Sequence, residues 1–233
     1  MITISNLKKQ FGETIACDIP SLKINDGDVL GLVGNNGAGK TTLFRMLLDL
    51  LKPDNGSILV DGINPASSEE WKEVTGAHLD DGFLIDYLTP EEYFAFIGKI
   101  SCIDQSMIEE RLNAFDKFTG GEVFGKNKLI RNLSAGNRQK VGIIAALLRN
   151  PKLVILDEPF NFLDPSSQNH LKTLLSDYHQ ETGATILISS HNLQHTIDIS
   201  SRITLLEKGR IIKDLQNEAG SSKEELTDYF EGK

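Results

Sequence analysis

A glycine-rich segment is the first part of the sequence whose residues could do chemistry. It reads Gly34, Asn35, Asn36, Gly37, Ala38, Gly39, Lys40 and Thr41, followed by Thr42, and it fits the pattern G-x-x-x-x-G-K-[ST]. Glycines let such a loop wrap so that successive backbone N–H groups point at phosphate oxygens. Lys40 then supplies a positive charge for the β- and γ-phosphates, and the Thr41 hydroxyl is a ligand for Mg²⁺. The segment therefore predicts a binding site for a nucleoside triphosphate.

Two adjacent carboxylates form the second candidate. Asp157 and Glu158 follow the apolar run of residues 153–156 and precede Pro159. In a parallel sheet, ligands bind at the carboxyl ends of the strands, where a phosphate loop and this pair would both lie. An aspartate there holds Mg²⁺ through water, and a glutamate beside it orients or deprotonates an attacking water. We predict that Asp157 holds the metal ion and that Glu158 orients or deprotonates the attacking water.

A parallel sheet is needed to bring these residues together. Residues 29–33 form an apolar run directly before the loop, and a helical stretch follows at residues 42–51. Two further apolar runs, residues 153–156 and 185–188, flank a helical stretch near residues 166–179. Strands that are buried on both faces and alternate with helices are typical of an α/β fold with a mostly parallel sheet.

The rest of the sequence predicts two additions to this core. Short strands at residues 2–7, 14–19 and 57–60 predict a small antiparallel β subdomain. Residues 74–148 show helical spacing with scattered aromatic side chains and predict a mostly helical insert. We expect a single domain over residues 1–233, divided into a catalytic core at residues 1–75 and 149–215, a helical subdomain at residues 76–148 and a short tail at residues 216–233.

Composition narrows the class of protein. The 233 residues are 39% hydrophobic and 24% charged, as in a folded soluble protein. A formal net charge of −9 disfavours a nucleic-acid binder, because phosphate contacts need a concentrated basic face. The longest apolar run, residues 141–148, is far shorter than the roughly 20 residues of a membrane-spanning helix. The first ten residues lack the pattern of a secretory signal, so we expect a cytoplasmic protein.

Residues 133–140 read Leu-Ser-Ala-Gly-Asn-Arg-Gln-Lys and resemble the signature motif of ABC ATPases. In that family two subunits enclose two ATP molecules, each between the phosphate loop of one subunit and the signature of the other. The resemblance implies that Ser134, Gly136 and Asn137 contact the nucleotide of a second subunit. Ser134 also suits the amino-terminal cap of a helix running to Arg149, whose positive dipole end would face a phosphate.

Other positions resemble the family's motifs in the same order. Phe11 resembles the aromatic residue that stacks on adenine, although Tyr is commoner there. Residues 163–165, Leu-Asp-Pro, resemble the loop that communicates between subunits. His191 resembles the histidine that touches the γ-phosphate and the catalytic glutamate. The resemblance thus implies three catalytic residues, namely Lys40, Glu158 and His191.

The sequence departs from the family's pattern at two motifs. Gln is usual where the core joins the helical insert, and aligning the neighbouring residues puts Asp80 there. Asp is shorter and charged, so it reaches Mg²⁺ through water and repels the γ-phosphate when no Mg²⁺ is bound. By this resemblance we assign the family's metal-contacting role to Asp80. In the signature, Ala135 and Asn137 replace the commoner Gly and Gln, which leaves the Ser134 hydroxyl and the Gly136 backbone in place.

The resemblance implies a P-loop ATPase that uses ATP and Mg²⁺ and powers an ABC transporter. Its expected partners are a membrane-spanning permease subunit and a second ATPase subunit, identical or paralogous, and no nucleic acid. The permease would hold the chain at the inner face of the cell membrane and contact residues 80–88, which include Phe83 and Tyr87.

Two alternatives differ in function. The first is an ABC ATPase coupled to a process other than transport, such as cell division, repair or translation. The 233 residues contain neither the long coiled-coil insertion of repair proteins nor the second domain of translation factors. The second is a P-loop GTPase or small-molecule kinase, but Asn127 and Lys128 are followed by Leu129 and Ile130, which does not match the base-reading pattern Asn-Lys-x-Asp.

Overall fold

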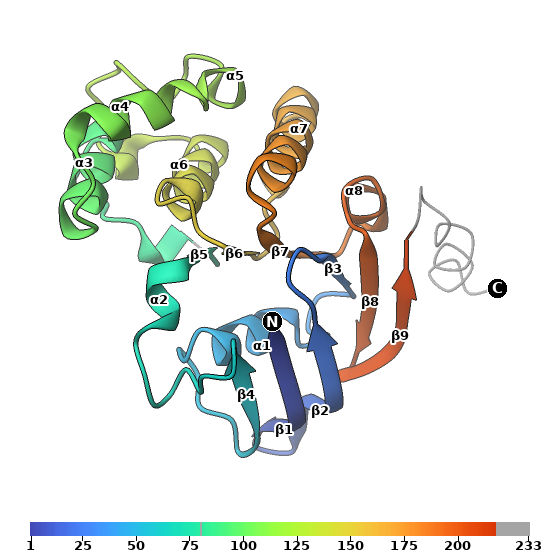
Figure 1. The fold of residues 1–233 in the computed structure, drawn as a ribbon. Coiled ribbons are helices and arrows are strands. Elements are labelled where there is room, and N and C mark those ends of the chain that lie inside the picture. The colour runs from blue at the N-terminus through green and yellow to red at the C-terminus, as the bar shows by residue number, and fades with distance from the viewer. Residues whose placement is uncertain (80, 218–233) are drawn as a thin grey trace.

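A computed structural model describes residues 1–79 and 81–217 (Figure 1). Asp80, which carries one predicted metal contact, lies outside the described residues, and so do residues 218–233. The described elements form layers around a six-stranded sheet, with helices on one face and a second, smaller sheet beyond the other. No helix within the described ranges has both the length and the apolarity that a membrane crossing requires.

The central sheet has the strand order β5-β6-β7-β3-β8-β9. Its strands are β3 (Val29–Val33), β5 (Thr75–His78), β6 (Leu153–Leu156), β7 (Thr185–Ser190), β8 (Arg202–Glu207) and β9 (Arg210–Gln216). The five strands from β5 to β8 pair in parallel, and β9 runs antiparallel to β8. Every residue of β3, β6 and β7 is buried, which agrees with their continuous apolar runs.

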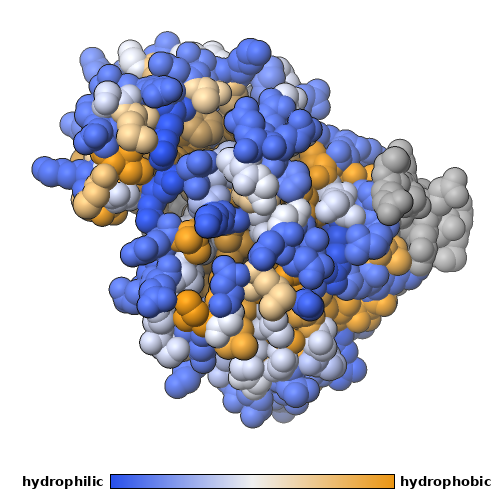
Figure 2. Space-filling model, in the orientation of Figure 1, coloured by the Kyte–Doolittle hydropathy of each residue, from blue (hydrophilic) through white to orange (hydrophobic). Residues whose placement is uncertain are grey.

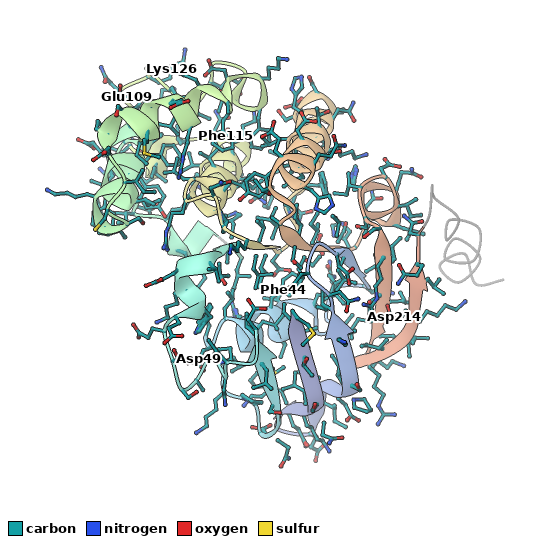
Figure 3. All side chains as sticks on the ribbon, in the orientation of Figure 1. Phe44, Asp49, Glu109, Phe115, Lys126 and Asp214 are labelled. Carbon is teal, nitrogen blue, oxygen red and sulfur yellow. The ribbon has the colours of Figure 1, made fainter. Side chains whose placement is uncertain are left out.

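The smaller sheet is antiparallel and packs through α1 (Lys40–Leu47) onto the central sheet (Figure 1). Its order is β2-β1-β4, formed by β1 (Ile2–Phe11), β2 (Thr14–Ile24) and β4 (Asn55–Val60). Phe44 of α1 is 1% exposed and lies in the interior between the two sheets (Figure 3). Burial of its ring contributes on the order of 2 kcal/mol, so α1 is anchored directly behind the glycine-rich loop.

Three helices cover the opposite face of the central sheet. They are α6 (Ala135–Leu147), α7 (Pro165–Thr182) and α8 (Leu193–Ile197), which lie side by side in Figure 1. Successive residues of β6 face opposite sides of the central sheet. Val154 packs with these helices, while Ile155 packs with α1. At Gly31 of β3, a Cβ atom would lie 1.9 Å from Cγ2 of Thr196, so glycine lets α8 approach the sheet closely.

The helical part lies beside α6 and holds η1 (Asp81–Phe83), α3 (Pro90–Ile100), α4 (Gln105–Asn113), α5 (Asp116–Thr119) and η2 (Ile130–Asn132). Helix α2 (Trp71–Val74) precedes β5 outside this part, and its Trp71 packs in the core around α1. Thr89 is the N-cap of α3 and forms a capping box with Glu92. Phe94 and Phe115 are buried in the core that joins this part to α6 and α7, and Figure 3 labels Phe115 there.

The structure confirms the predicted fold class of a mostly parallel core sheet, an antiparallel β subdomain and a helical insert. One detail of the prediction is wrong: Thr75–His78, expected at the start of the helical stretch, form strand β5 beside β6. Gly76 explains why a strand fits there, because a Cβ atom would lie 1.9 Å from the Ala146 carbonyl oxygen of α6. Strands β8 and β9 and helix α8 were not predicted. The limits of the helical subdomain stay a prediction.

Candidate active site

Three parallel strands end at one edge of the central sheet and bring the candidate residues together. β7 lies between β6 and β3, so their carboxyl ends are neighbours. β3 leads into the glycine-rich loop, β6 into Asp157 and Glu158, and β7 into His191. The Gly34 N–H donates to the Ser190 carbonyl at 3.3 Å, which ties the start of the loop to β7.

The glycine-rich loop, residues 34–41, has a conformation that requires glycine. Gly37 has φ of 81° and Gly39 has φ of 109°, values that residues with a Cβ atom rarely adopt. A Cβ atom on Gly39 would also lie 2.2 Å from the Ala16 carbonyl oxygen of β2. The loop wraps around Lys40, whose Nζ donates to the carbonyl oxygens of Gly34 at 2.6 Å and Asn35 at 3.3 Å.

Asp157 lies beside the start of α1. Its Oδ2 accepts a hydrogen bond from Oγ1 of Thr41 at 2.5 Å, and its Oδ1 accepts one from Oγ of Ser189. Burial raises the pKa of the Asp157 carboxyl above its ordinary value, while the two hydroxyl donors oppose the shift. The contact with Thr41 joins the β6 end to the glycine-rich loop.

The two carboxylate oxygens of Glu158 contact two different basic residues. Its Oε1 lies 3.1 Å from Nζ of Lys40, and its Oε2 lies 2.8 Å from Nδ1 of His191. The backbone of Glu158 has φ of 49°, an uncommon conformation for a residue other than glycine. Two contacts hold this turn in place, because the Glu158 N–H donates to Oγ of Ser189 at 2.8 Å and the Glu158 carbonyl accepts from Nε2 of Gln139 at 3.3 Å.

The oxygen atoms at Thr41 and Asp157 suit a magnesium ion. They are hard donors, and the hydrogen bond of 2.5 Å between them shows that they lie side by side next to the loop. No group of three or more His, Cys, Asp or Glu side chains that could hold a metal was found among residues 1–79 and 81–217. Mg²⁺ commonly binds through one or two protein oxygens with phosphate oxygens and water as its other ligands. The donor set therefore fits Mg²⁺ brought in with a nucleotide.

A cavity of about 260 Å³ lies over the loop. Its lining includes Thr14, Ala16, residues 36–42 and Glu158. Phe11 is not part of this lining; it ends β1, is 51% exposed, and has Nζ of Lys9 5.5 Å from its ring centroid. The cavity thus joins the phosphate loop and Glu158, and the predicted adenine-stacking residue Phe11 pairs with Thr14 at its border without lining it.

The signature residues also lie outside this cavity. Ser134 is exposed and caps α6, because its Oγ accepts from the Asn137 N–H at 3.2 Å. A Cβ atom on Gly136 would lie 2.6 Å from the Phe162 carbonyl oxygen, so glycine permits a close contact with the loop after Glu158. Within one chain, the structure does not bring Ser134, Gly136 or Asn137 to the phosphate loop.

Two supporting residues were missed in the sequence. Ser189 bridges Asp157 and the Glu158 backbone, and Gln139 connects the Glu158 carbonyl to the His78 ring, with 3.2 Å between Oε1 of Gln139 and Nε2 of His78. The serine pair that follows the apolar residues and ends β7 is the signal that could have indicated Ser189. Gln139 had no comparable signal, since its role depends on how α6 packs.

Comparisons with known proteins point to one family. The protein-family model described as "ABC transporter" matches residues 17–161 of this chain. The probable sulfate/thiosulfate import ATP-binding protein CysA of Chlorella vulgaris is 34% identical over 228 residues, which cover 98% of this chain and 94% of that protein. The bacitracin transport ATP-binding protein BcrA of Enterococcus faecalis is 33% identical over 221 residues, covering 92% and 69%.

Solved structures share the fold. The structure of cbiO1 from Clostridium perfringens, part of the ABC transporter complex cbiONQ, superposes with a TM-score of 0.77 at 27% identity and covers 98% of this chain and 91% of its own. A dimeric ATP-binding cassette, MJ0796, in a post-hydrolysis state bound to ADP and Pi has a TM-score of 0.83 at 24% identity, with 94% and 100% covered.

Proposed function

The chain belongs to the ABC transporter family as an ATP-binding and ATP-hydrolysing subunit, and we propose that the residues around Lys40 and Glu158 perform this hydrolysis. The observation that carries the proposal is the position of Glu158, whose carboxylate contacts both Lys40 and His191 at the edge of the cavity. This arrangement puts a base, a residue that orients it and a phosphate-binding cation within one contact network.

ATP binding is proposed at residues 34–42. The loop glycines and the first turn of α1 offer backbone N–H groups to the phosphates, and Lys40 supplies the positive charge. Phe11 is proposed to stack on the adenine ring, because its half-exposed ring is available to a planar group and its strand partner Thr14 lines the cavity. Thr41 and Asp157, with Asp80 through water, are proposed to hold Mg²⁺, which neutralises charge on the β- and γ-phosphates when bound.

Hydrolysis is proposed to begin with a water molecule beside Glu158. The Glu158 carboxylate accepts a proton from the water as the water oxygen forms a bond to the γ-phosphorus. The bond from that phosphorus to the oxygen bridging it to the β-phosphate breaks, and the products are ADP and phosphate. His191 positions the carboxylate, since both its Nδ1 at 2.8 Å and its N–H at 3.2 Å contact Oε2.

A second ATPase subunit is proposed to complete the site. Ser134 is exposed at the amino end of α6, where the helix N–H groups and the positive dipole end suit a γ-phosphate. Because Ser134, Gly136 and Asn137 lie outside the cavity of their own chain, they are available to the nucleotide of another. ATP would then hold two subunits together by contacting both, and its hydrolysis would allow them to separate.

Glu158→Gln tests both parts of this proposal. The variant keeps the shape of the side chain and loses the proton acceptor, so we expect ATP turnover to fall by a factor of about 10² or more while ATP still binds. It should form a dimer in MgATP, which size-exclusion chromatography measures. Turnover equal to the unaltered protein would contradict the role of Glu158, and a monomer at saturating ATP would contradict the dimer.

A membrane-spanning permease is the proposed partner on the side of the molecule that carries η1. A groove of about 340 Å³ there is lined mainly by apolar side chains, among them Leu48, Leu50, Trp71, Leu79 and Phe83. Leu50 is 51% exposed and Phe83 54% exposed. Figure 2 shows apolar side chains beside a hollow between the helical part and the β subdomain. A groove of this kind suits a short helix with an apolar face, and such a contact would place the chain at the inner face of the cell membrane.

Phe83→Asp tests the permease contact. A charge in the groove should abolish copurification with the permease and leave the ATPase rate of the isolated chain within about twofold, since the side chain lies outside the nucleotide cavity. Ile212→Asp is the matched control, because Ile212 is a 45% exposed apolar residue of β9. Equal copurification of the two variants would contradict the proposed surface.

A further inference from the structure

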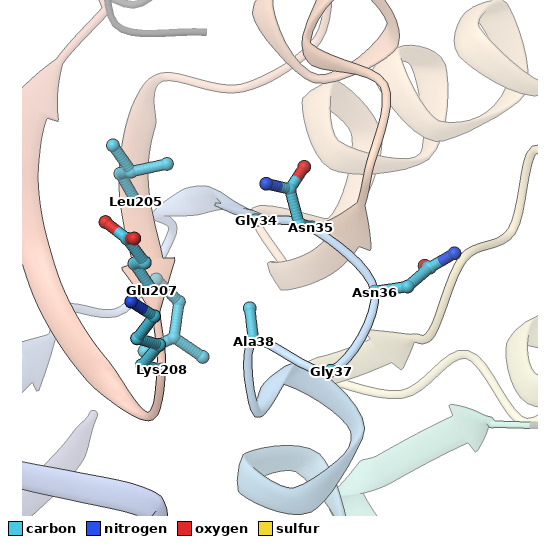
Figure 4. A pocket seen from close by; sticks show the side chains of 9 residues that line it. Gly34, Asn35, Asn36, Gly37, Ala38, Leu205, Glu207 and Lys208 are labelled. Carbon is cyan, nitrogen blue, oxygen red and sulfur yellow. The ribbon is translucent and has the colours of Figure 1, made fainter.

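The hairpin between β8 and β9 lies directly against the phosphate loop. Lys208 and Gly209 form its two-residue turn, and Glu207 pairs with Arg210. Figure 4 shows residues of this hairpin on one side of a pocket and the phosphate loop on the other. The pocket is lined by residues 34–38 and 205–208 and has a volume of about 220 Å³. Neither the sequence motifs nor the proposed chemistry gives this hairpin a role.

Two hydrogen bonds place the Gly209 backbone between the loop and β2. The Gly209 N–H donates to the Ala38 carbonyl oxygen at 2.8 Å, and the Gly209 carbonyl accepts from the Asp18 N–H at 2.7 Å. The Arg210 side chain adds an ion pair, with 3.0 Å between its Nη2 and Oδ2 of Asp18. The turn is therefore fixed to β2 on one side and holds one carbonyl of the loop on the other.

The hydrogen bond to the Ala38 carbonyl also fixes the direction of the Gly39 N–H group. The peptide between Ala38 and Gly39 is planar and trans, so its C=O and N–H bonds point in opposite directions. Because the Ala38 carbonyl points at Gly209, the Gly39 N–H points away from the hairpin. Gly39 lines the cavity that also contains Lys40 and Glu158.

We propose that the β8–β9 turn positions the phosphate loop, with the Gly209 N–H holding the Ala38 carbonyl so that the Gly39 N–H is aimed at the phosphates of the nucleotide. This inference rests on the proposed phosphate-binding role of residues 34–42. Gly209 is a positioning residue, since it acts through Ala38 and Gly39 and touches no substrate. The consequence is that nucleotide affinity depends on a turn remote from the loop in sequence.

Glycine is required at position 209 for two separate reasons. Its φ is 79°, which favours glycine, and a Cβ atom there would lie 2.9 Å from the backbone carbon of Ala16 and from the nitrogen of Cys17. Gly62 separates these effects. It follows Asp61 in another turn, has the same φ of 79°, and a Cβ atom on it would meet nothing within 4 Å. Alanine at either position carries the same backbone strain, but only at position 209 does it push the turn out of place.

The test compares Gly209→Ala with Gly62→Ala by calorimetric titration with ADP in the presence of Mg²⁺. ADP requires only one chain, so the measurement does not depend on dimer formation. We expect the Kd for ADP to rise about tenfold in Gly209→Ala relative to Gly62→Ala, the size of one charge-assisted hydrogen bond to phosphate. Gly209→Ala should unfold at the lower temperature, because the clash adds to the strain that both variants share, so both titrations are made below the two unfolding midpoints. Equal Kd values in the two variants would overturn the inference.

Two further variants complete the experiment. Arg210→Gln removes the ion pair to Asp18 without backbone strain, and it should raise the Kd for ADP about twofold; if Gly209→Ala does not fold, an unchanged Kd in Arg210→Gln overturns the inference. Lys40→Ala tests the phosphate loop itself. If Lys40→Ala binds ADP normally, the proposed nucleotide site fails, whereas a loss in Lys40→Ala with normal binding in Gly209→Ala refutes only the positioning role.

Discussion

Nζ of Lys40 lies 3.1 Å from Oε1 of Glu158, so the phosphate-binding cation and the proposed base are in direct contact. The other oxygen of the same carboxylate, Oε2, lies 2.8 Å from Nδ1 of His191. Triphosphate carries more negative charge than one carboxylate, and it would compete for the Lys40 ammonium. We expect ATP binding to draw Lys40 from Glu158, which leaves one carboxylate oxygen free to accept the proton of water.

Lys40→Ala should remove most of the affinity for ATP. Lys40 is 5% exposed and its ammonium is held by two loop carbonyls. Residues 34–41 contain no other lysine or arginine that could replace it. We expect the Kd for ATP to rise by a factor of ten or more, roughly the loss of one charged hydrogen bond. Lys52→Ala, at an exposed position before β4, is the control and should bind as the unaltered protein does. Equal affinity in both variants would remove Lys40 from the site.

Asp157→Asn should stabilise the folded protein while it slows hydrolysis. Burial raises the pKa of the Asp157 carboxyl in the folded state, so the folded state binds this proton more tightly than the unfolded chain does. The stability cost of the ionised carboxylate starts to accrue as pH rises past 3.8, its ordinary pKa, and is fully present above the raised folded value. At low pH the group is protonated in both states and the cost disappears.

Denaturant unfolding at several pH values checks this expectation. Asp157→Asn should have the larger free energy of unfolding at pH 7 in the absence of nucleotide, and the difference should shrink at acid pH. Its hydrolysis should fall by a factor of about 10² or more, because a metal-contacting carboxylate is lost. A variant less stable than the unaltered protein at pH 7 would show that the hydrogen bonds from Thr41 and Ser189 outweigh the burial of the charge.

Phe162 should contribute to the contact between subunits. Phe160 and Leu163 are buried on either side of it, while its own side chain is 71% exposed with a strained φ of 63°. In the Glu158→Gln background, Phe162→Ala should weaken the ATP-dependent dimer about tenfold, as truncation of an aromatic anchor does. Analytical ultracentrifugation measures this constant. Tyr87→Ala is the control with 72% exposure, and the same dimer constant in both variants would rule out a specific role.

Continuous apolar runs made the centre of the fold predictable. Residues 29–33 and 153–156 were predicted as strands with the bounds that the structure gives, because a strand buried on both faces carries no polar interruption. β5 has no such run, since Thr75 and Gly76 depend on packing against β6 and α6. β9 lies at the sheet edge with alternating partly exposed residues, and it carries a weaker signal.

The candidate site was predictable only in part. Spacing identified the phosphate loop and the two carboxylates, because local backbone and side-chain chemistry define both motifs. The contact between Lys40 and Glu158 and the bridge through Ser189 depend on the order of strands in the sheet, which a single sequence does not fix. The contact of Gly209 with Ala38 has the same origin, since it requires β8 to lie beside β3.

The structure of Glu158→Gln with Mg²⁺ and ATP tests whether two subunits share each nucleotide. We predict a dimer in which each ATP lies between residues 34–41 of one subunit and residues 134–137 of the other. Thr41 and Asp157 should lie at the metal ion and Gly39 at the phosphates. A complex in which ATP contacts the phosphate loop while residues 134–137 of every other subunit lie elsewhere would contradict this prediction.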